Sequence, residues 1–360
     1  MTTQCLVILF LFFLSIPSSY SQQIIYLSSF GGGKSTQIDA TGAYALYVSA
    51  YSDSKELLSQ LFIQTPTDPL ISLYQLKFRK MHSTSGFLQP FRVLHKQKAS
   101  LVSNLTDSQM KTLHGFLYIT TAKQMNSNSF FVFDVNQTET VSFDNTKPDN
   151  CTIVFLNSNF SYTQPSGSII SGWIQNDNKS SVSIYQGIPT NSDELRSSEI
   201  FSNPVSTTEK YRFMYNVEKF SLSLPIFYLK TYRGVQFNIS AGYYDVNGTQ
   251  TTAQSTTGFY MKPMNSPERN ITIDILTVNT LVADTSKKLT GANAIGTMPK
   301  NSTISINSVG ADGKMNGYST TPISQILGWS TPLMGKSILI SSKNGYTGQF
   351  FVQYYTLSYN

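Results

Sequence analysis

Cysteine is nearly absent from this sequence, which holds two cysteines in 360 residues. Cys5 lies in an apolar run at the start of the chain, so Cys151 stands alone in the rest. Without a second cysteine no intramolecular disulfide can form, and stability must come from buried surface. The strand-like residues after Cys151 favour a buried thiol that packs as a small hydrophobe. An intermolecular disulfide is the alternative that the sequence leaves open.

Long apolar runs are missing after the first residues. The run Leu6–Ile16 is interrupted only by Ser15 and is too short to span a bilayer as a helix. Pro17 follows, and Ser19-Tyr20-Ser21 has the small-x-small pattern that precedes signal cleavage. We therefore predict a signal peptide over residues 1–21. With no membrane span and no anchor signal expected in the remainder, the predicted location is secreted and extracellular.

Residues that carry catalysis are scarce or badly spaced. The three histidines, His82, His95 and His114, lack the i, i+4 spacing of a zinc-binding helix, and the carboxylates are scattered. The run Gly31–Thr36 reads GGGKST, but a phosphate-binding loop needs glycine at Ser28 and a helix afterwards. No Gly-x-Ser-x-Gly elbow occurs. We expect no enzyme, no metal site and no cofactor.

Asparagine, in contrast, is plentiful and often lies in acceptor sites for N-glycosylation. Each acceptor has the form Asn-x-Ser/Thr without proline in the middle, and the set is spread over most of the chain. Behind a signal peptide such a set predicts a glycoprotein, and each glycan must face water. The acceptors are Asn104, Asn136, Asn150, Asn159, Asn178, Asn238, Asn247, Asn270 and Asn301.

Alternation of apolar and polar residues with a period of two dominates the chain and predicts β-strands. The best strands by this criterion and by their β-branched and aromatic content are Tyr44–Tyr51, Phe130–Val135, Gln236–Ser240 and Gln349–Tyr355. Helical patterns are few; residues 53–62 and Thr106–Leu113 could each form two turns, the latter with Thr106 as N-cap. We predict an all-β protein made of tandem β-sandwich units of the jelly-roll type.

An imperfect internal repeat sets the expected domain organisation. Gly172–Ile184 resembles Gly296–Ile306, since both run from glycine through an acceptor-bearing turn into a Ser-centred strand. Downstream, a Tyr-x-Gly turn leads into an aromatic strand at both Tyr232 and Tyr346. Phe130–Val135 is expected to close the first unit. The predicted boundaries are residues 22–143, 144–262 and 263–360, each of ordinary domain size.

The first unit resembles nematode CUB-like secreted proteins. Asp39–Tyr51 is similar to the turn and long strand of that module, and His114–Thr121 followed by Phe130–Val135 is similar to its two closing strands. The resemblance implies a jelly-roll sandwich and a role in extracellular defence, such as innate immunity, or in stress responses. The sequence departs from CUB domains because it lacks their disulfide cysteines and offers no residues for their acidic calcium cluster.

One basic stretch could form a binding surface. No Asp or Glu occurs from Pro69 to Thr106. Alternation predicts strands with Phe78, Phe91 and Val93 inward and the charges on one face. An ordinary solvated face is the alternative; the functional interpretation is a patch for anionic glycans or for an anionic microbial or host surface. Nucleic acid is not expected because the protein is exported. The predicted binding residues are Lys77, Arg79, Lys80, Arg92, Lys96 and Lys98.

These observations favour a non-enzymatic secreted binding or effector protein. The alternative is a structural component of an extracellular matrix, cuticle or mucus, suggested by the hydroxyl- and amide-rich composition. A hydrolase with an unrecognised site is a third hypothesis, which no motif supports.

Overall fold

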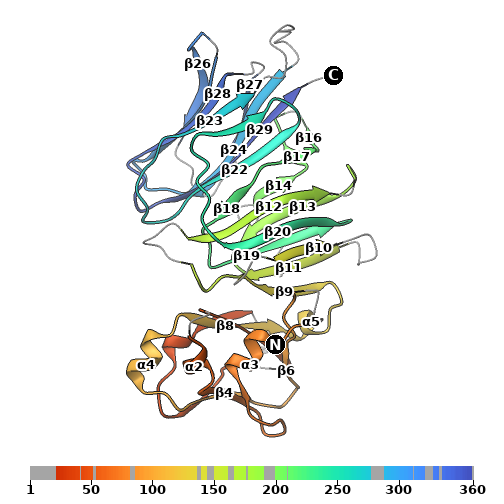
Figure 1. Ribbon diagram of the computed structural model, residues 1–360, viewed down its shortest axis with the longest axis vertical. Helices are drawn as coiled ribbons and strands as arrows, with labels where there is room; N and C mark the ends of the chain where they lie inside the picture. Colours follow the sequence, from red (N-terminus) through yellow and green to blue (C-terminus); the bar gives the residue numbers. More distant parts are fainter. Residues whose placement is uncertain are drawn as a thin grey trace, which may run out of the picture.

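The computed structural model of the protein is almost entirely β-structure, which confirms the predicted fold class (Figure 1). The predicted signal peptide, residues 1–21, lies outside the described part of the chain. The structure describes residues 22–360 apart from residues 41, 52–53, 82–85, 136–138, 144–149, 161–165, 176, 190–198, 209, 277–287, 311, 321–326, 332–334 and 359–360.

The first sandwich consists of two four-stranded antiparallel sheets. One has the order β1 (Gln23–Tyr26), β8 (Gly115–Thr121), β3 (Tyr44–Ala50), β6 (Phe91–Val93). The other has the order β2 (Ser35–Gln37), β7 (Ser100–Ser103), β4 (Leu61–Gln64), β5 (Ile71–Ser72). Strands 1, 8, 3 and 6 therefore face strands 2, 7, 4 and 5, which is the strand order of a jelly roll. Alternate apolar side chains of both sheets fill the space between them.

The second sandwich repeats this order. Its 1-8-3-6 sheet is β10 (Glu139–Phe143), β20 (Val235–Gly242), β12 (Gly167–Gln175), β18 (Phe220–Leu222). Its 2-7-4-5 sheet is β11 (Asn150–Leu156), β19 (Ile226–Tyr232), β13 (Ser181–Gln186), β14 (Glu199–Asn203). An additional strand, β9 (Phe130–Asp134), pairs in parallel with β11 at the edge. Between β14 and β18 the chain forms a small ribbon of β15 (Val205–Ser206) and β16 (Tyr211–Arg212).

The third sandwich has the same order again. Its 1-8-3-6 sheet is β22 (Thr256–Lys262), β29 (Gln349–Ser358), β24 (Lys288–Thr297), β27 (Leu327–Thr331). Its 2-7-4-5 sheet is β23 (Ile271–Leu276), β28 (Ser337–Lys343), β25 (Thr303–Val309), β26 (Met315–Thr320). Two additional strands pair in parallel with these sheets: β21 (Thr249–Thr252) with β23, and β17 (Asn216–Val217) with β22.

The internal repeat seen in the sequence falls on equivalent strands. Both copies of the first motif run from strand 3 into strand 4 of their sandwich, which is β12 to β13 and β24 to β25. Both copies of the second motif form the turn from strand 7 to strand 8, which is β19 to β20 and β28 to β29. The predicted repeat is therefore a repeat of topology.

Two expectations about the unit limits are corrected by the strand pairing. Phe130–Asp134 does not close the first sandwich but pairs with β11 of the second, and β10 also belongs to the second sandwich. Likewise β21 and β22, which precede the expected limit at residue 262, pair within the third sandwich. The reason is that each linking segment is itself strand-forming and adds to a sheet of the sandwich that follows it.

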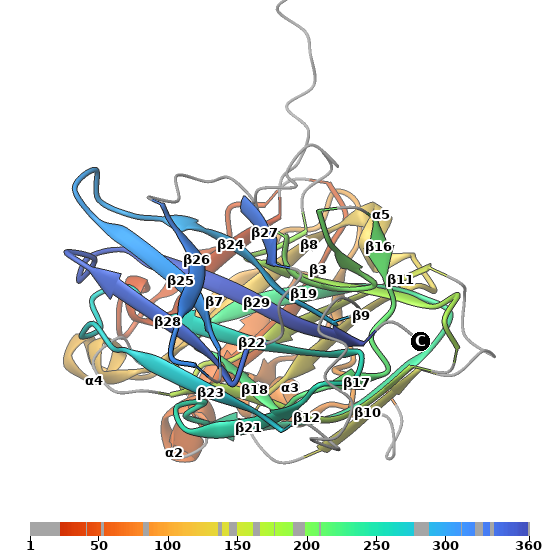
Figure 2. The same ribbon diagram turned by 90° about the horizontal axis from the view of Figure 1, so that it is seen from above.

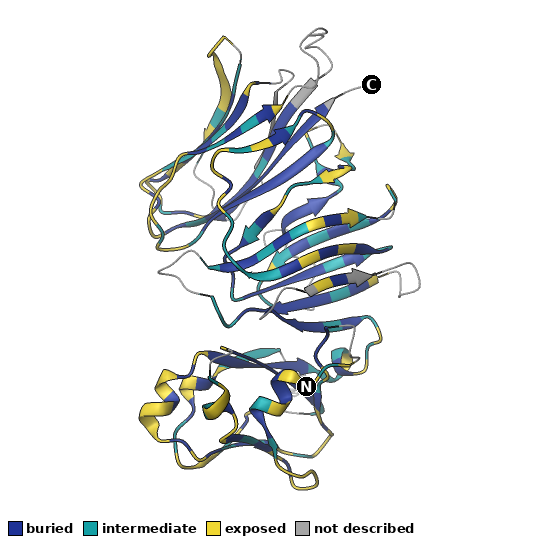
Figure 3. Cartoon of the chain, in the orientation of Figure 1, coloured by how far each residue is buried: buried dark blue, intermediate teal, exposed yellow. Residues whose placement is uncertain are grey.

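The sandwiches lie over one another along the long axis of the molecule (Figures 1 and 2). The outer face of the first 1-8-3-6 sheet packs on the outer face of the second 2-7-4-5 sheet, with Tyr47 and Tyr118 on one side and Val154 and Tyr228 on the other. Strand β3, whose sequence is largely apolar, is consequently buried on both faces, and so is most of β8 beside it (Figure 3). Burial of both faces follows from the packing of sandwich on sandwich.

The helices of the described residues lie in or beside the first sandwich. They are η1 (Leu27–Ser29), α2 (Lys55–Leu58), α3 (Leu73–Phe78), α4 (Asp107–Thr112) and α5 (Ala122–Met125). Helix α4 begins after Thr106, as predicted, with a capping box to Gln109. Helix α3 replaces the strand expected around Lys77. Ser72 caps it, accepting a hydrogen bond from the backbone of Gln75.

Candidate functional site

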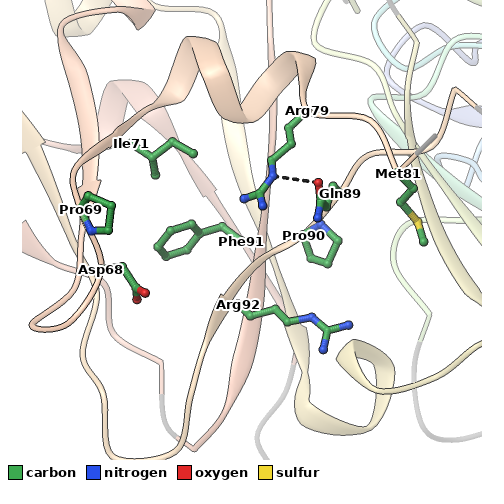
Figure 4. A pocket seen from close by; sticks show the side chains of 9 residues that line it. All are labelled: Asp68, Pro69, Ile71, Arg79, Met81, Gln89, Pro90, Phe91 and Arg92. Carbon is green, nitrogen blue, oxygen red and sulfur yellow. Dashed lines mark hydrogen bonds between the residues drawn. The ribbon is translucent and has the colours of Figure 1, made fainter. Parts of the chain in front are cut away.

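The candidate site is a cleft at one edge of the first sandwich. At this edge, called here the 5/6 edge, one sheet ends with strand 5 and the other with strand 6. The cleft has a volume of about 520 Å³ and lies between Ile71 of β5 and Phe91 of β6 (Figure 4). The segment that follows α3 contributes a further wall. The remaining lining residues are Asp68, Pro69, Arg79, Met81, Gln89, Pro90 and Arg92.

Two guanidinium groups give the cleft its charge. Arg79 Nε donates a hydrogen bond to Gln89 Oε1 at 2.9 Å, which fixes the side chain in the position seen in Figure 4. Neither Arg79 nor Arg92 forms an ion pair with a described residue. The one lining carboxylate, Asp68, accepts a hydrogen bond from Thr65 Oγ1 at 2.6 Å. Its Oδ2 is thus engaged away from the arginines.

The positive charge of Arg92 also acts on the neighbouring strand of its own sheet. Burial raises the pKa of the Tyr47 hydroxyl well above its ordinary value, and the positive charge of Arg92 partly opposes this rise. Tyr47 is on β3, the strand that pairs with β6. The side chain of Arg92 is exposed while its neighbours Phe91 and Val93 are buried, as the alternation predicted. Strand β6 therefore holds one arginine at the mouth of the cleft.

A second, apolar cleft adjoins the first. It has a volume of about 580 Å³ and shares Pro69, Ile71 and Arg79 with it, so Arg79 lies between the two. Its other lining residues are mainly apolar: Leu70, Tyr74, Gln75 and Phe78. Leu70 is 55% exposed and Phe78 is 42% exposed, which is unusual for such large apolar side chains. The two clefts together make a groove that is cationic at one end and apolar at the other.

Lys77 is the clearest error among the predicted binding residues. It is 1% exposed, and its Nζ donates to Asp134 Oδ2 at 2.6 Å. Ser49 Oγ donates to the other oxygen of the same carboxylate, also at 2.6 Å. The helical turn of α3 directs Lys77 inward and Phe78 outward, the reverse of the predicted strand. The ion pair of Lys77 therefore joins α3 to β9, and the Lys77 side chain is not available to a ligand.

The other predicted cations are dispersed. Lys80 is half-buried in a bridge with Leu88, whereas Lys96 and Lys98 are exposed in the turn after β6 and do not line the cleft. His95 is exposed nearby, and His82 lies outside the described residues. Of the six predicted residues, only Arg79 and Arg92 come together in the cleft.

Sequence reasoning missed the apolar half of the groove. Leu70 and Tyr74 were not singled out, and Phe78 was predicted to point inward, because the segment was interpreted as a strand. The signal that could have revealed them is Ser72-Leu-Tyr-Gln75, a capping-box pattern that marks a helix start. From that start, Tyr74 and Phe78 are spaced i, i+4 on one helix face, and their rings lie 5.0 Å apart.

The acceptor asparagines lie mostly where glycans can be carried. Asn136 lies outside the described residues, and Asn159 is only half-exposed, with its Oδ1 buried and without a hydrogen bond. The exposed acceptors are Asn104, Asn150, Asn178, Asn238, Asn247, Asn270 and Asn301. Among the described residues of the first sandwich the only acceptor is Asn104, which lies between β7 and α4; Figure 1 shows α4 at the end away from β6.

Cys151 and Trp173 are core residues. Cys151 is 3% exposed in the core of the second sandwich, which confirms the hydrophobic interpretation and leaves no surface thiol for an intermolecular bridge. Trp173 stacks on Phe237 with ring centroids 5.4 Å apart, so it is not a sugar-binding platform. Neither residue extends the candidate site.

Solved structures resemble the chain only weakly. The PBSX exported protein XepA is 11% identical over 66% of this chain and 92% of that chain, with a TM-score of 0.18. The structure of Sulfolobus turreted icosahedral virus is 10% identical over 94% and 89%, with a TM-score of 0.16. A β-porphyranase of glycoside hydrolase family 86 from Bacteroides plebeius is 10% identical over 74% and 42%, with a TM-score of 0.14. No inference about fold or function follows from scores this low.

Comparison with the curated proteins found no relative of this chain. Among the described residues, no helix has both the length and the apolar character needed to cross a membrane. A family model described as transmembrane glycoprotein matches residues 41–360. This family is not the CUB-like one predicted from the strand pattern, but it agrees with the predicted glycosylation. Since the match spans nearly all of the described residues, the chain belongs to the transmembrane glycoprotein family.

Proposed function

We propose that this protein is a secreted, non-catalytic glycoprotein that binds an anionic ligand through the arginine cleft of its first sandwich. The observation that carries the proposal is the pair Arg79 and Arg92, which line one cleft and form no ion pair with a described residue. Guanidinium groups in such positions recognise carboxylate, sulfate or phosphate groups through paired hydrogen bonds. Anionic glycans on a microbial or host surface supply groups of this kind.

The distribution of glycosylation acceptors supports the cleft as the binding surface. The second and third sandwiches carry most of the exposed acceptors, whereas the first sandwich has one described acceptor, Asn104, which precedes α4 and lies outside the cleft. Glycans cover the surface around their attachment point. A glycan at Asn104 would therefore leave the cleft accessible.

Retention on immobilised heparin tests the proposal. Arg79→Gln combined with Arg92→Gln should elute at a markedly lower salt concentration than the native protein, since two phosphate- or sulfate-binding charges are lost. The matched control is Lys96→Gln with Lys98→Gln, which removes two exposed charges of the same segment outside the cleft. Exposed charges are screened within about 10 Å at 0.1 M salt.

The control should elute close to the native protein, and thermal unfolding should show that both variants are folded. Equal retention of the native and arginine variants would contradict the proposal, and so would an equal loss in the lysine control. In that case the alternative of a structural matrix component would gain weight. Induction of expression by microbial challenge would then separate a defence role from a structural one. The CUB-like relationship of the first unit stays a prediction.

Secretion can be tested independently. We expect the exported protein to begin after residue 21 and to carry glycans at a majority of the nine acceptor sites. Mass spectrometry with and without glycosidase treatment measures both. Migration at the mass of the bare polypeptide would contradict the proposed location, whatever the cleft binds.

A further inference from the structure

The 5/6 edge of the second sandwich shows how such an edge binds a neighbour. Strand β14, its fifth strand, lies against β29 of the third sandwich. The side-chain amide of Gln353 bonds both backbone groups of Ser202: Ser202 N donates to Oε1 at 3.1 Å, and Nε2 donates to Ser202 O at 2.7 Å. Phe201 and Phe220 pack on Phe259 beside this contact. Hydrogen bonds from a side-chain amide to the backbone of the edge strand and apolar packing therefore act together at this edge.

The same edge of the first sandwich has no such cover in the described part of the chain. Strand β5 pairs only with β4, and β6 pairs only with β3, so each has one side without a neighbouring strand. The groove lies between these two edges. Unpaired strand edges are templates for an added extended segment.

The charged and apolar residues of the groove favour an extended peptide over an anionic polysaccharide as its ligand. An anionic polysaccharide would satisfy Arg79 and Arg92 but offers little apolar surface to Leu70, Tyr74 and Phe78. An extended peptide offers backbone groups, carboxylates and apolar side chains at a regular spacing. Arg79 lies where the cationic and apolar clefts meet, so a carboxylate placed there would have apolar neighbours on one side.

We propose that the groove at the 5/6 edge of the first sandwich docks an extended segment of a partner protein in which acidic residues are flanked by large apolar ones. This inference rests on the proposed function, because it names the ligand class of the same arginine cleft. The carboxylates pair with Arg79 and Arg92, and an apolar side chain packs on Phe78 and Leu70. The segment covers this edge as the third sandwich covers the corresponding edge of the second, with its own backbone groups in place of the Gln353 amide.

The test uses the full glycosylated chain and a fluorescein-labelled peptide in which glutamate alternates with leucine or phenylalanine, blocked at both ends. Binding is followed by fluorescence anisotropy, with heparin retention measured in parallel. Phe78→Ser and, separately, Leu70→Ser should each weaken peptide binding by about tenfold, the effect of losing one partly buried apolar contact. Neither should change heparin retention. Arg79→Gln should weaken both.

Two controls sharpen the experiment. Leu94→Ser removes a side chain that is 57% exposed and follows β6 but does not line the groove, so peptide binding should be unchanged. A peptide with glutamine in place of glutamate should bind weakly. If the native protein is retained on heparin through its arginines but does not bind the acidic peptide, the inference is overturned and the proposed function stands. If Leu94→Ser weakens peptide binding as much as Phe78→Ser, the groove is not the docking site.

Discussion

The first and second sandwiches share one strand order, yet the connection from strand 5 to strand 6 is used differently in each. In the second, this connection leaves the sandwich: Val205 and Met214 pack with Tyr355 and Leu357, and β17 pairs with β22 of the third. In the first, the connection forms α3, and its described residues next to α3 and next to β6 line the groove. Sandwiches with the same strand order can therefore use this connection differently: one connection packs on the next sandwich, and the other lines a groove that is open to solvent.

The chemistry of the two edges follows the same division. The edge of the second sandwich is aromatic and is covered by the third, as a permanent interface requires. The edge of the first combines arginines with half-exposed apolar groups, a composition suited to a partner that comes and goes. Substitutions at the junctions between the sandwiches should show how much stability each contact contributes, and the largest effect is expected at the first junction.

The strongest dependence is expected at the junction of the first two sandwiches. Lys77→Ala should lower the free energy of unfolding by about 3–5 kcal/mol, because it removes the ammonium group that pairs with the buried Asp134 carboxylate. Chemical denaturation measures this loss. Combining Lys77→Met with Asp134→Asn removes both charges while keeping an acceptor for Ser49, and should restore most of the stability. A loss below about 1 kcal/mol in Lys77→Ala would show that the pair is unimportant.

A smaller loss is expected at the covered edge of the second sandwich. Gln353→Ala should cost about 3 kcal/mol, because the buried N–H and C=O of Ser202 lose their partners. Gln349→Ala on the same strand is the control. Its amide donates to Gln186 at an exposed site, so the expected change is under about 0.5 kcal/mol. Equal stability of the two variants would contradict the importance of edge coverage.

Lys262, at the end of β22, should make the third sandwich sensitive to pH. Burial lowers the pKa of its ammonium group from 10.5 to about 8, against the opposing charge of Glu268. Between about pH 8 and pH 10 the unfolded state therefore holds more protons than the folded state, and the free energy of unfolding rises with pH. The slope is at most about 1.4 kcal/mol per pH unit. Below pH 8 this group contributes no slope.

Denaturation at several pH values measures that slope, and Lys262→Met should abolish it. Exposed Lys343→Met should leave it unchanged. The ammonium of Lys262 donates to the carbonyl oxygens of Pro263, Tyr346 and Gly348, so Lys262→Met also lowers stability at every pH. An unchanged slope in Lys262→Met would show that another group titrates in this range.

The smallest effect is expected from reductant. Because Cys151 is buried in the core of the second sandwich and forms no disulfide, denaturation midpoints with and without a reducing agent should agree. Non-reducing electrophoresis should show no dimer. A dimer band that disappears on reduction would contradict the core position of the thiol.

Several features could be predicted from the sequence because they depend on local patterns. Alternation gave the all-β class, Thr106 with Gln109 gave the start of α4, and the Gly172 and Gly296 motifs revealed the topological repeat. The jelly-roll type follows from many short strands of even spacing. In the candidate site, the absence of acidic residues from Pro69 to Thr106 pointed to Arg79 and Arg92.

Other features depend on contacts between residues far apart in the chain. Lys77 was predicted to be exposed because alternation cannot reveal Asp134, which approaches it only when β9 joins the second sandwich. The same pairing moved the unit limits, since a strand's partner is decided by which sheet edge it meets. The sequence by itself determined most of the segments that form strands, and the capping-box patterns at Ser72 and Thr106 marked two helix starts. Only the tertiary structure decided which faces and edges are covered, because burial depends on what packs against a surface and not on its own pattern.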